Sequence, residues 1–253
     1  QQRSSAASDV YKRQQFMATN ITELPFPVSL ASQRWLEQNG FDKIGRCASI
    51  GGGHHECYVI SNTVGENIVA KVATGDSDIL LAEAAGLDLI ASANVVRIPD
   101  VLHCDKQCLL IEYIEEAQQT SDYWRLLAEA IAHLHRQAPS LEGSLSNPYG
   151  LADDNYCGTL AQPNGWFEDG HEFFSEQRLL YQARLAFDNG LLESPWIISI
   201  ESICERLTEL IPWQSSSLLH GDLWPGNILV DQYGKPALID PAVYYGWREA
   251  DIA

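Results

Sequence analysis

Residues 218–253, LLHGDLWPGNILVDQYGKPALIDPAVYYGWREADIA, decide the fold. An apolar pair at the start leads into a tight loop that carries Asp222, and Asn227 follows five positions later. A second apolar run predicts a strand that leaves this loop, and a third run, after a glycine turn, ends at Asp240. The sequence therefore predicts two carboxylates and an amide at the ends of short strands that form a hairpin.

These residue types suit the transfer of a phosphoryl group from a nucleotide. The reaction needs a carboxylate near the attacking hydroxyl and oxygen ligands that hold Mg²⁺ against the phosphates. Asp222 suits the first role, and Asn227 and Asp240 suit the second. Their spacing is the catalytic-loop pattern of kinase-like folds. The alternative is that Asp222 and Asn227 only form the loop, because both residue types favour turns beside Gly and Pro.

The segment HGDLWPGN, followed by IDPAVYYGWREADIA, closely resembles the fructosamine kinase (ketosamine 3-kinase) family. This family is a branch of the aminoglycoside-phosphotransferase and choline-kinase-like group. The HGD-x4-N pattern alone marks the wider group, whereas Trp224 and residues 240–246 narrow the resemblance to the ketosamine branch. The resemblance implies an α/β (α+β) protein-kinase-like fold of two lobes, a small antiparallel-sheet N-terminal lobe and a mainly helical C-terminal lobe.

The same resemblance implies a role for each residue of the motif. Asp222 would be the catalytic base, and Asn227 and Asp240 would be the metal ligands. Asp251 would brace the catalytic loop from a buried position.

The composition limits the classes of partner. The chain of 253 residues, with 45% hydrophobic residues, suits one enzyme domain or two small lobes. Its net charge of −18 argues against nucleic acid, because phosphate backbones are held by clustered Lys and Arg. An acidic surface does not exclude ATP, which arrives with Mg²⁺. No apolar stretch is long enough to span a bilayer, so no membrane partner is expected.

Six scattered cysteines without a secretory signal favour free thiols in a reducing cytoplasm. We expect a monomer.

The two ends of the chain suggest non-native boundaries. Residues 1–16 are polar and contain no Met, and the single Met of the chain is Met17. We therefore expect residues 1–16 to be a non-native extension. Residues 17–116 would form the N-terminal nucleotide-binding lobe, and residues 117–253 the catalytic and substrate lobe. Because the family continues with further helices, the second lobe is expected to be truncated at Ala253.

A glycine run interrupts two predicted strands in the N-terminal lobe, after a predicted helix over residues 28–39. Gly51, Gly52 and Gly53 would let the backbone approach a phosphate without obstruction by side chains. The alternative is an ordinary hairpin turn.

The next apolar strand, residues 68–72, carries Lys71, and an unpaired ammonium would be costly there. In the kinase pattern this lysine contacts the α and β phosphates and an acidic residue on the next helix. Glu83, in the predicted helix 77–92, is the best candidate for that acid. The alternative places Lys71 on an exposed edge strand.

Residues 109–114, LLIEYI, are typical of the hinge strand of a kinase. We expect the backbone of Glu112, Tyr113 and Ile114 to bind adenine, through the carbonyl of Glu112 and the amide of Ile114.

The second lobe is predicted to begin with a helix over residues 121–137, capped by Ser121 or Thr120. His133 and His135 on this helix are interpreted as packing or surface residues. Residues 147–180 predict a loop-rich excursion before a helix over residues 173–189, and a shorter helix is expected over residues 201–210.

The excursion contains the patterns DNY-x-G, Q-x-N-x-W and FF-x3-RL, which resemble the ketosamine branch. By that resemblance Gln162, Asn164 and Trp166 would shape a sugar-amine pocket. Amides suit the recognition of hydroxyl groups, and an indole suits a sugar ring or an amine cation. The alternative for Trp166 is that it anchors a long loop to the core.

The sequence thus favours an enzyme that transfers the γ-phosphate of ATP, with Mg²⁺, to a sugar hydroxyl (O3) of a ketosamine. The substrate would be a small-molecule or protein-bound fructosamine or ribulosamine, and the outcome would be deglycation. One alternative is a small-molecule kinase of the choline or aminoglycoside phosphotransferase group. Another is a non-catalytic nucleotide-binding protein. The sequence argues against this alternative, because every position of the catalytic set carries the expected residue.

Overall fold

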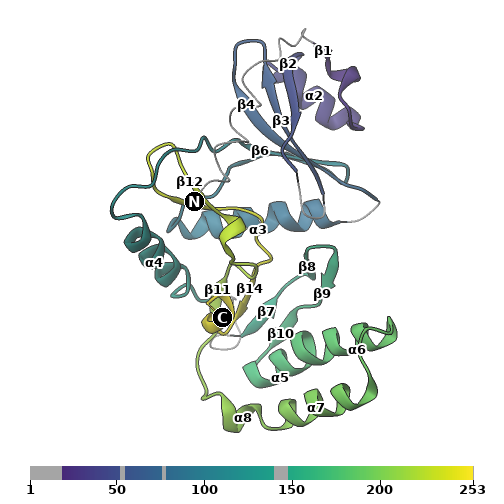
Figure 1. Ribbon diagram of the computed structural model, residues 1–253, viewed down its shortest axis with the longest axis vertical. Coiled ribbons are helices and arrows are strands. Elements are labelled where there is room, and N and C mark those ends of the chain that lie inside the picture. Colours follow the sequence, from purple (N-terminus) through teal and green to yellow (C-terminus); the bar gives the residue numbers. More distant parts are fainter. Residues whose placement is uncertain (1–18, 52–54, 76–77, 140–147, 253) are drawn as a thin grey trace, which may run out of the picture. The chain divides into compact units, whose positions relative to one another are not determined.

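The computed structural model describes residues 19–51, 55–75, 78–139 and 148–252 (Figure 1). The chain divides into two compact units, Gln1–Asp76 with Leu102–Tyr113, and Ser77–Val101 with Ile114–Ala253. The predictions for residues 1–16, Met17, Gly52 and Gly53 lie outside the described residues.

The first unit is built on a six-stranded sheet in the order β1-β2-β3-β4-β6-β5. Strands β2, β3 and β4 follow one another along the chain and pair antiparallel, as expected for hairpins. A single α-helix, α2 (Leu30–Gln38), accompanies the sheet in the described part of this unit. The other elements are β1 (Thr19–Asn20), η1 (Ile21–Glu23), β2 (Lys43–Ser49), β3 (Glu56–Asn62), β4 (Asn67–Val72), β5 (Val101–Cys104) and β6 (Cys108–Glu112).

One face of this sheet packs against α2. In β4 the apolar residues Ile68, Ala70 and Val72 alternate along the strand, so all three face the same side and are buried. They share a core with Leu36 of the helix and with Ile60 of β3. The period-two pattern of the strand and the apolar stripe of the helix therefore explain why these two elements form this layer.

Lys71 is buried within the sheet, with only 5% of its surface exposed. Its strand lies between β3 and β6, where Lys71 is opposite Cys57 on one side and Leu109 on the other. The predicted strand is confirmed, and the alternative of an exposed lysine on an edge strand is wrong.

A carboxylate joins the helix and the sheet of the first unit. Asp105, in the turn between β5 and β6, accepts hydrogen bonds from the hydroxyls of Ser29 and Ser32 at the start of α2. Its second oxygen accepts from the amides of Gln107 at 2.8 Å and Cys108 at 2.9 Å. Burial opposes ionisation of Asp105, but these hydrogen bonds outweigh it and lower its pKa from 3.8 to about 2.

The first prediction concerns the stability of this unit. Because the folded pKa of Asp105 is depressed, its contribution is present above pH 3.8 and is lost as the pH falls towards about 2. Asp105→Asn should lower the free energy of unfolding by about 1–3 kcal/mol at neutral pH, since four donors lose an ionised acceptor. It should also flatten the loss of stability between these pH values. Thermal melting at a series of pH values checks this.

The matched control is Asp42→Asn, which changes an exposed acid on the same unit. An equal loss of stability in both variants at neutral pH would contradict the assigned role of Asp105.

The second unit contains three small sheets and most of the helices (Figure 1). A four-stranded sheet has the order β10-β7-β14-β11, and two hairpins pair β8 with β9 and β12 with β13. The helices are α3 (Ile79–Ala93), α4 (Tyr123–Leu134), α5 (Gly170–Phe174), the π-helical segment η2 (Ser175–Leu180), α6 (Tyr181–Asp188), α7 (Ser194–Glu205), α8 (Leu207–Leu210), η3 (Pro225–Asn227) and η4 (Arg248–Asp251). The strands are β7 (Tyr149–Leu151), β8 (Asn155–Cys157), β9 (Leu160–Gln162), β10 (Gly165–Phe167), β11 (Ser217–Leu219), β12 (Ile228–Val230), β13 (Pro236–Leu238) and β14 (Tyr244–Gly246).

The predicted helices are present, but several boundaries differ. Helix α4 follows Asp122 and has no side-chain cap, so the predicted caps at Thr120 and Ser121 are wrong. The helix expected over residues 201–210 is two helices, α7 and α8, and α7 begins at Ser194 because Pro195 suits the first turn of a helix. The excursion is more regular than predicted, since its polar residues pair in the short strands β7–β10.

Helix α3 belongs to the second unit, whereas the predicted division placed residues 77–101 in the first lobe. Gly86 lets α3 pack closely against residues 241–243, because a Cβ there would lie 3.3 Å from Val243 and 3.5 Å from Pro241. The segment after the helix is also held, since the carbonyl of Arg97 accepts a hydrogen bond from Leu238 of β13 at 2.9 Å.

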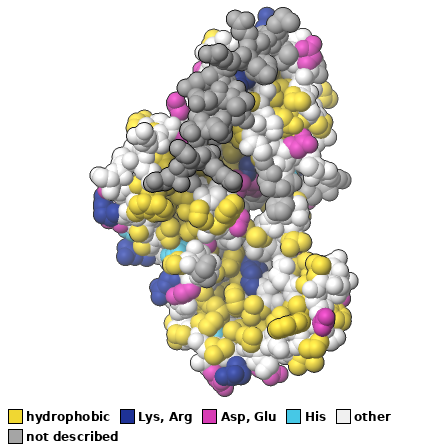
Figure 2. All heavy atoms as spheres, in the orientation of Figure 1, with side chains coloured by type: hydrophobic (Ala, Val, Ile, Leu, Met, Phe, Trp, Pro, Cys, Tyr) yellow, Lys and Arg dark blue, Asp and Glu magenta, His cyan; other side chains and the backbone are white. Residues whose placement is uncertain are grey.

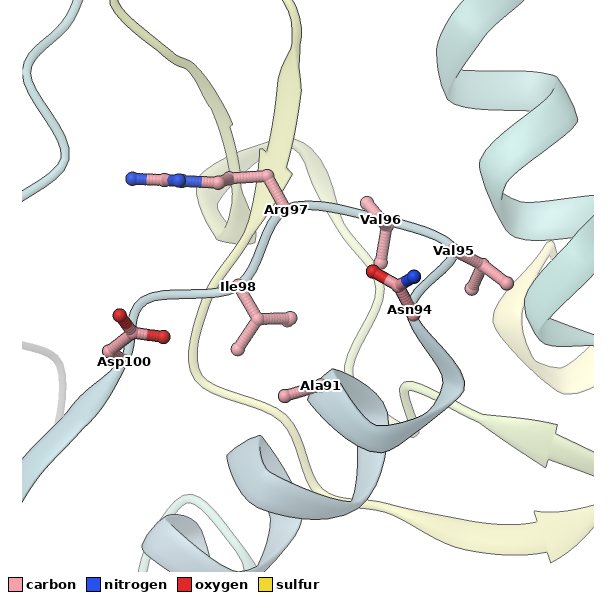
Figure 3. Close-up of a pocket in the computed structure, with 7 residues that line it drawn as sticks. All are labelled: Ala91, Asn94, Val95, Val96, Arg97, Ile98 and Asp100. Atoms are coloured by element: carbon pink, nitrogen blue, oxygen red, sulfur yellow. The ribbon is translucent and has the colours of Figure 1, made fainter.

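A pocket of about 390 Å³ lies at the C-terminal end of α3 (Figure 3). Ile98 faces Ala91 there, and the side chain of Arg97 extends away from both (Figure 3). The lining contains none of the predicted site residues; it consists of Ala91, Asn94, Val95, Val96, Arg97, Ile98 and Asp100.

The surface of the second unit is partly apolar. Helix α7 buries none of its residues, and 61% of Trp196 and 65% of Ile198 are exposed. Hydrophobic side chains gather on the displayed face over the region of α5–α8 (Figure 2). None of the helices that the structure describes is long and apolar enough to cross a bilayer.

Candidate active site

The register of the β12–β13 hairpin brings two of the predicted residues together. Ile228 pairs with Leu238, and the carbonyl of Asn227 accepts a hydrogen bond from the amide of Ile239 at 3.1 Å. Asn227 therefore lies beside the residue that precedes Asp240, although thirteen positions separate Asn227 from Asp240 in the sequence. The predicted hairpin is confirmed.

A hydrogen bond adds the third predicted residue to this group. The side-chain Nδ2 of Asn227 donates to the carboxylate Oδ2 of Asp222 at 3.0 Å and to its carbonyl at 2.9 Å. Asn227 is buried and Asp222 is half-buried. The amide oxygen Oδ1 of Asn227 is then the atom that could bind a cation, because Nδ2 is already a donor to Asp222.

The residue types of Asp222, Asn227 and Asp240 suit a Mg²⁺ ion that is shared with phosphates. Carboxylate and amide oxygens are ligands that this hard cation prefers, and it commonly takes only one or two carboxylates from the protein. Asp240 has a positive φ of 56°, a conformation that few residues other than glycine adopt and that is often found at functional sites. In the described part of the chain no group of three His, Cys, Asp or Glu side chains could hold a metal. A cation here would need further ligands from a nucleotide.

The loop before Asp222 requires glycine. Gly221 has φ +81°, and a Cβ on it would overlap the carbonyl of Ala242. The amide of Ala242 donates to the carbonyl of His220 at 2.8 Å. The loop of Asp222 and the segment after Asp240 are thus held directly against each other.

His220 supports the same contact from the interior. It is fully buried, and its Nε2 donates to the carbonyl of Ile239 at 2.9 Å. Its Nδ1 accepts from the amide of Asp222 at 3.3 Å. Burial lowers the pKa of His220 and outweighs the nearby carboxylates, so the ring is neutral and carries its proton on Nε2.

Asp251 braces the loop, as the resemblance implied. Its two carboxylate oxygens accept hydrogen bonds from the amides of His220 and Gly221, both at 2.8 Å. The Nε2 of His135, the residue that follows the last turn of α4, donates to the same carboxylate at 2.9 Å, and both side chains are almost fully buried. His135 is buried, as its interpretation as a packing residue allowed, but its hydrogen bond to Asp251 was not predicted. No local pattern could reveal this contact, because its two residues are 116 positions apart.

The second prediction tests this brace. Asp251→Ala should lower the free energy of unfolding by about 3 kcal/mol, because two buried amides and one imidazole lose a charged partner. Urea denaturation followed by tryptophan fluorescence measures the loss. Glu249→Ala removes an exposed acid two positions away and should cost less than about 1 kcal/mol. Similar losses in the two variants would contradict the brace.

Gln162 and Asn164, the predicted pocket amides, are buried and bonded to protein atoms. The Nε2 of Gln162 donates to Asn155 at 2.9 Å and to the carbonyl of Ala242 at 3.2 Å. The Nδ2 of Asn164 donates to Asn155 at 3.0 Å, and its Oδ1 accepts from Arg178 at 2.7 Å. These contacts shape the wall of the excursion, and direct contact with a substrate stays a prediction. Asn155 and Arg178 were not singled out from the sequence, although both occur in the quoted patterns.

Trp166 and Cys157 lie in strands of the same excursion. The Trp166 ring is half-buried, with its centroid 5.9 Å from that of Tyr245. Burial raises the pKa of the Cys157 thiol; the Asp222 carboxylate raises it further and the Arg178 guanidinium opposes this. Asp222 and Arg178 therefore both lie near the β8–β9 hairpin.

The predicted nucleotide-binding residues are divided between the units. Gly51, Lys71, Glu112 and Tyr113 belong to the first unit. Glu83 and Ile114 belong to the second, so the pairing of Lys71 with Glu83 stays a prediction.

Comparison with known proteins identifies the family of this chain. The family model described as fructosamine kinase matches residues 28–253. The chain belongs to the fructosamine kinase family. Its fold is accordingly the protein-kinase-like α/β fold that the sequence predicted.

Relatives within the family are moderately similar. A probable ketoamine kinase of Klebsiella aerogenes is 36% identical over 179 residues, which are 69% of this chain and 59% of that protein. A chloroplastic protein-ribulosamine 3-kinase of Oryza sativa subsp. indica is 31% identical over 232 residues, 87% of this chain and 65% of that protein. The chain thus spans less than two thirds of the length of these curated relatives.

Solved structures show the same fold. The crystal structure of a putative fructosamine-3-kinase from Haemophilus somnus 129PT has a TM-score of 0.76 and 28% identity, over 87% of this chain and 74% of that one. The streptomycin–ATP–APH(2")-IIa ternary complex has a TM-score of 0.53 and 17% identity, over 89% of this chain and 75% of that one. At that identity the second likeness concerns the fold alone.

Proposed function

We propose that the chain carries the catalytic apparatus of an ATP-dependent ketosamine 3-kinase. The reaction would transfer the γ-phosphate of ATP to the O3 hydroxyl of a fructosamine or ribulosamine, free or protein-bound, and would lead to deglycation of the amine. The free state of all six cysteines fits a reducing cytoplasm as its location.

The observation that supports the proposal is the hydrogen bonding of Asn227 to Asp222 at the end of the β12–β13 hairpin, next to the residue that precedes Asp240. The hydrogen bonds of Asn227 hold the Asp222 carboxylate in place, and the hairpin register bonds Asn227 to Ile239, the residue before Asp240. Membership of the fructosamine kinase family supports a ketosamine as the acceptor.

Each residue would have a separate task. Asp222 would orient the sugar hydroxyl and accept its proton, since its carboxylate is half-buried and fixed by an amide. The backbone at Gly51 and the ammonium of Lys71 would bind the phosphates, and Glu83 would orient Lys71. The backbone of Glu112, Tyr113 and Ile114 would bind the adenine, and the Trp166 ring would contact the sugar-amine.

Asn227 and Asp240 would hold the metal ion. Mg²⁺ bound there would neutralise charge on the phosphates of ATP.

The third prediction concerns the acceptor. Incubation with ATP, Mg²⁺ and a ribulosamine derivative of lysine should give a phosphorylated sugar that phosphorus NMR detects. Choline and an aminoglycoside, tested at the same concentration, should give at least tenfold less product, because the excursion resembles the ketosamine branch. Faster phosphorylation of choline or the aminoglycoside would instead favour a small-molecule kinase of the wider group. Nucleotide binding without any product would favour a non-catalytic role.

The fourth prediction concerns the base. Asp222→Ala should lower kcat on the ketosamine by at least ~10²-fold, because general-base catalysis contributes about that much or more. The affinity for ATP should stay within about twofold, since Asp222 is not assigned to the nucleotide. Asp188→Ala, at an exposed acid on α6, is the matched control and should keep full activity. Turnover at the wild-type rate by the Asp222 variant would remove the assignment.

The fifth prediction concerns the metal. Asp240→Asn removes the charge of a proposed ligand, so half-maximal activity should need at least ~tenfold more Mg²⁺. Titration with Mg²⁺ at fixed ATP measures this. The same requirement in the variant and the wild type would exclude Asp240 as a ligand.

A further inference from the structure

Arg178 is a largely buried cation to which the proposed chemistry gives no task. It lies in the π-helical segment Ser175–Leu180, an uncommon geometry that often occurs at functional sites. Its guanidinium carbon is 4.0 Å from the ring centroid of Tyr244 and 4.6 Å from that of Phe173. No carboxylate forms an ion pair with it in the described part of the chain. The two aromatic faces and neutral acceptors therefore stabilise the charge.

The guanidinium fork holds the turn between β9 and β10. Its Nη1 donates to the carbonyl of Pro163 at 2.6 Å and to that of Gln177 at 2.9 Å. Its Nη2 donates to the side-chain oxygen of Asn164 at 2.7 Å. A lysine could not supply this planar set of donors and stack between two rings at the same time.

From Asn164 a chain of buried amides continues in one direction. The Nδ2 of Asn164 donates to the Oδ1 of Asn155, and the Nδ2 of Asn155 donates to the carbonyl of Val243 at 2.7 Å. Gln162 donates in parallel to Asn155 and to the carbonyl of Ala242. Each donor strengthens the next bond by polarisation, so the guanidinium charge at the start reinforces the whole chain.

This series of amide hydrogen bonds ends close to the proposed reacting groups. Ala242 and Val243 follow Asp240 by two and three residues, and the amide of Ala242 is bonded to the loop of Asp222. At its other end the chain fixes residues 153–164, which include the hairpin near Asp222. The acceptor-side excursion is thus tied to the backbone that carries the base and the metal ligand.

We propose that Arg178 is a positioning residue, which holds residues 153–164 against the segment after Asp240 and so sets the place of the acceptor sugar relative to Asp222. The inference rests on the proposed function for the identity of the acceptor. Arg178 does not touch ATP in this proposal, so its loss should weaken acceptor binding more than nucleotide binding.

Steady-state kinetics with a ribulosamine derivative of lysine tests the proposal. Arg178→Lys and Arg178→Ala should both raise KM for the ketosamine at least ~tenfold, because two or more charge-assisted hydrogen bonds are lost. KM for ATP should stay within about twofold. Added methylguanidinium should restore part of the loss in Arg178→Ala. Arg184→Ala, at an exposed arginine on α6, should match the wild type.

A second variant interrupts the chain without removing the cation. Asn164→Asp keeps the acceptor for Arg178 but replaces the donor to Asn155 by a carboxylate oxygen, so it should raise the ketosamine KM to a similar extent. A wild-type ketosamine KM in Arg178→Lys, or a fall in kcat with both KM values unchanged, would overturn the proposal.

Hydrogen–deuterium exchange without any substrate separates this inference from the proposed function. Residues 153–164 should exchange at least ~tenfold faster in Arg178→Lys than in the wild type, whereas β2–β4 of the first unit should be unchanged. If the wild type phosphorylated no ketosamine, the proposed function would fail. The comparison of exchange rates would still test the positioning role of Arg178. Equal exchange of residues 153–164 in both proteins would overturn the positioning role.

Discussion

Two backbone segments of the second unit, residues 220–222 and 241–243, approach so closely that only glycine fits at position 221. This constraint governs the candidate site, because one segment carries Asp222 and the other begins next to Asp240. The hydrogen bonds of Ala242, His220 and Ile239 join the two segments in the interior. The site is therefore held by backbone contacts, and its side chains need few partners of their own to keep their places.

Three buried groups surround this contact and support it from different directions. Asp251 accepts from the amides of the first segment and is itself bonded to His135. Gly86 lets α3 pack against the second segment, and the amides of Asn155 and Gln162 bind its carbonyls. Most of these groups are polar and lie in the interior, where unpaired donors would be costly. Their hydrogen bonds explain how the candidate site can be held in place although it lies on short strands and loops.

The sequence predicted the parts of the site that depend on neighbours along the chain. The β12–β13 hairpin follows from two apolar runs and a glycine turn, and the strand of Lys71 follows from the apolar run over residues 68–72. It could not predict His135 as the partner of Asp251, because the contact depends on how α4 packs. The start of α7 was missed for another reason, since a helix that buries none of its residues leaves no clear apolar stripe. The amide chain was missed because polar, glycine-rich residues predict a loop whether or not they are buried.

The sequence separation of the brace has a consequence for biosynthesis. The amide of His220 and the carboxylate of Asp251 are 31 residues apart, with the brace on the C-terminal side. During translation the loop of Asp222 is made first and leaves the ribosome with its amides still hydrated. It can reach its folded geometry only after Asp251 has followed, so a nascent chain completes the candidate site late. Premature termination between these positions would release a chain that has Asp222 but lacks the carboxylate that binds the amides of its loop.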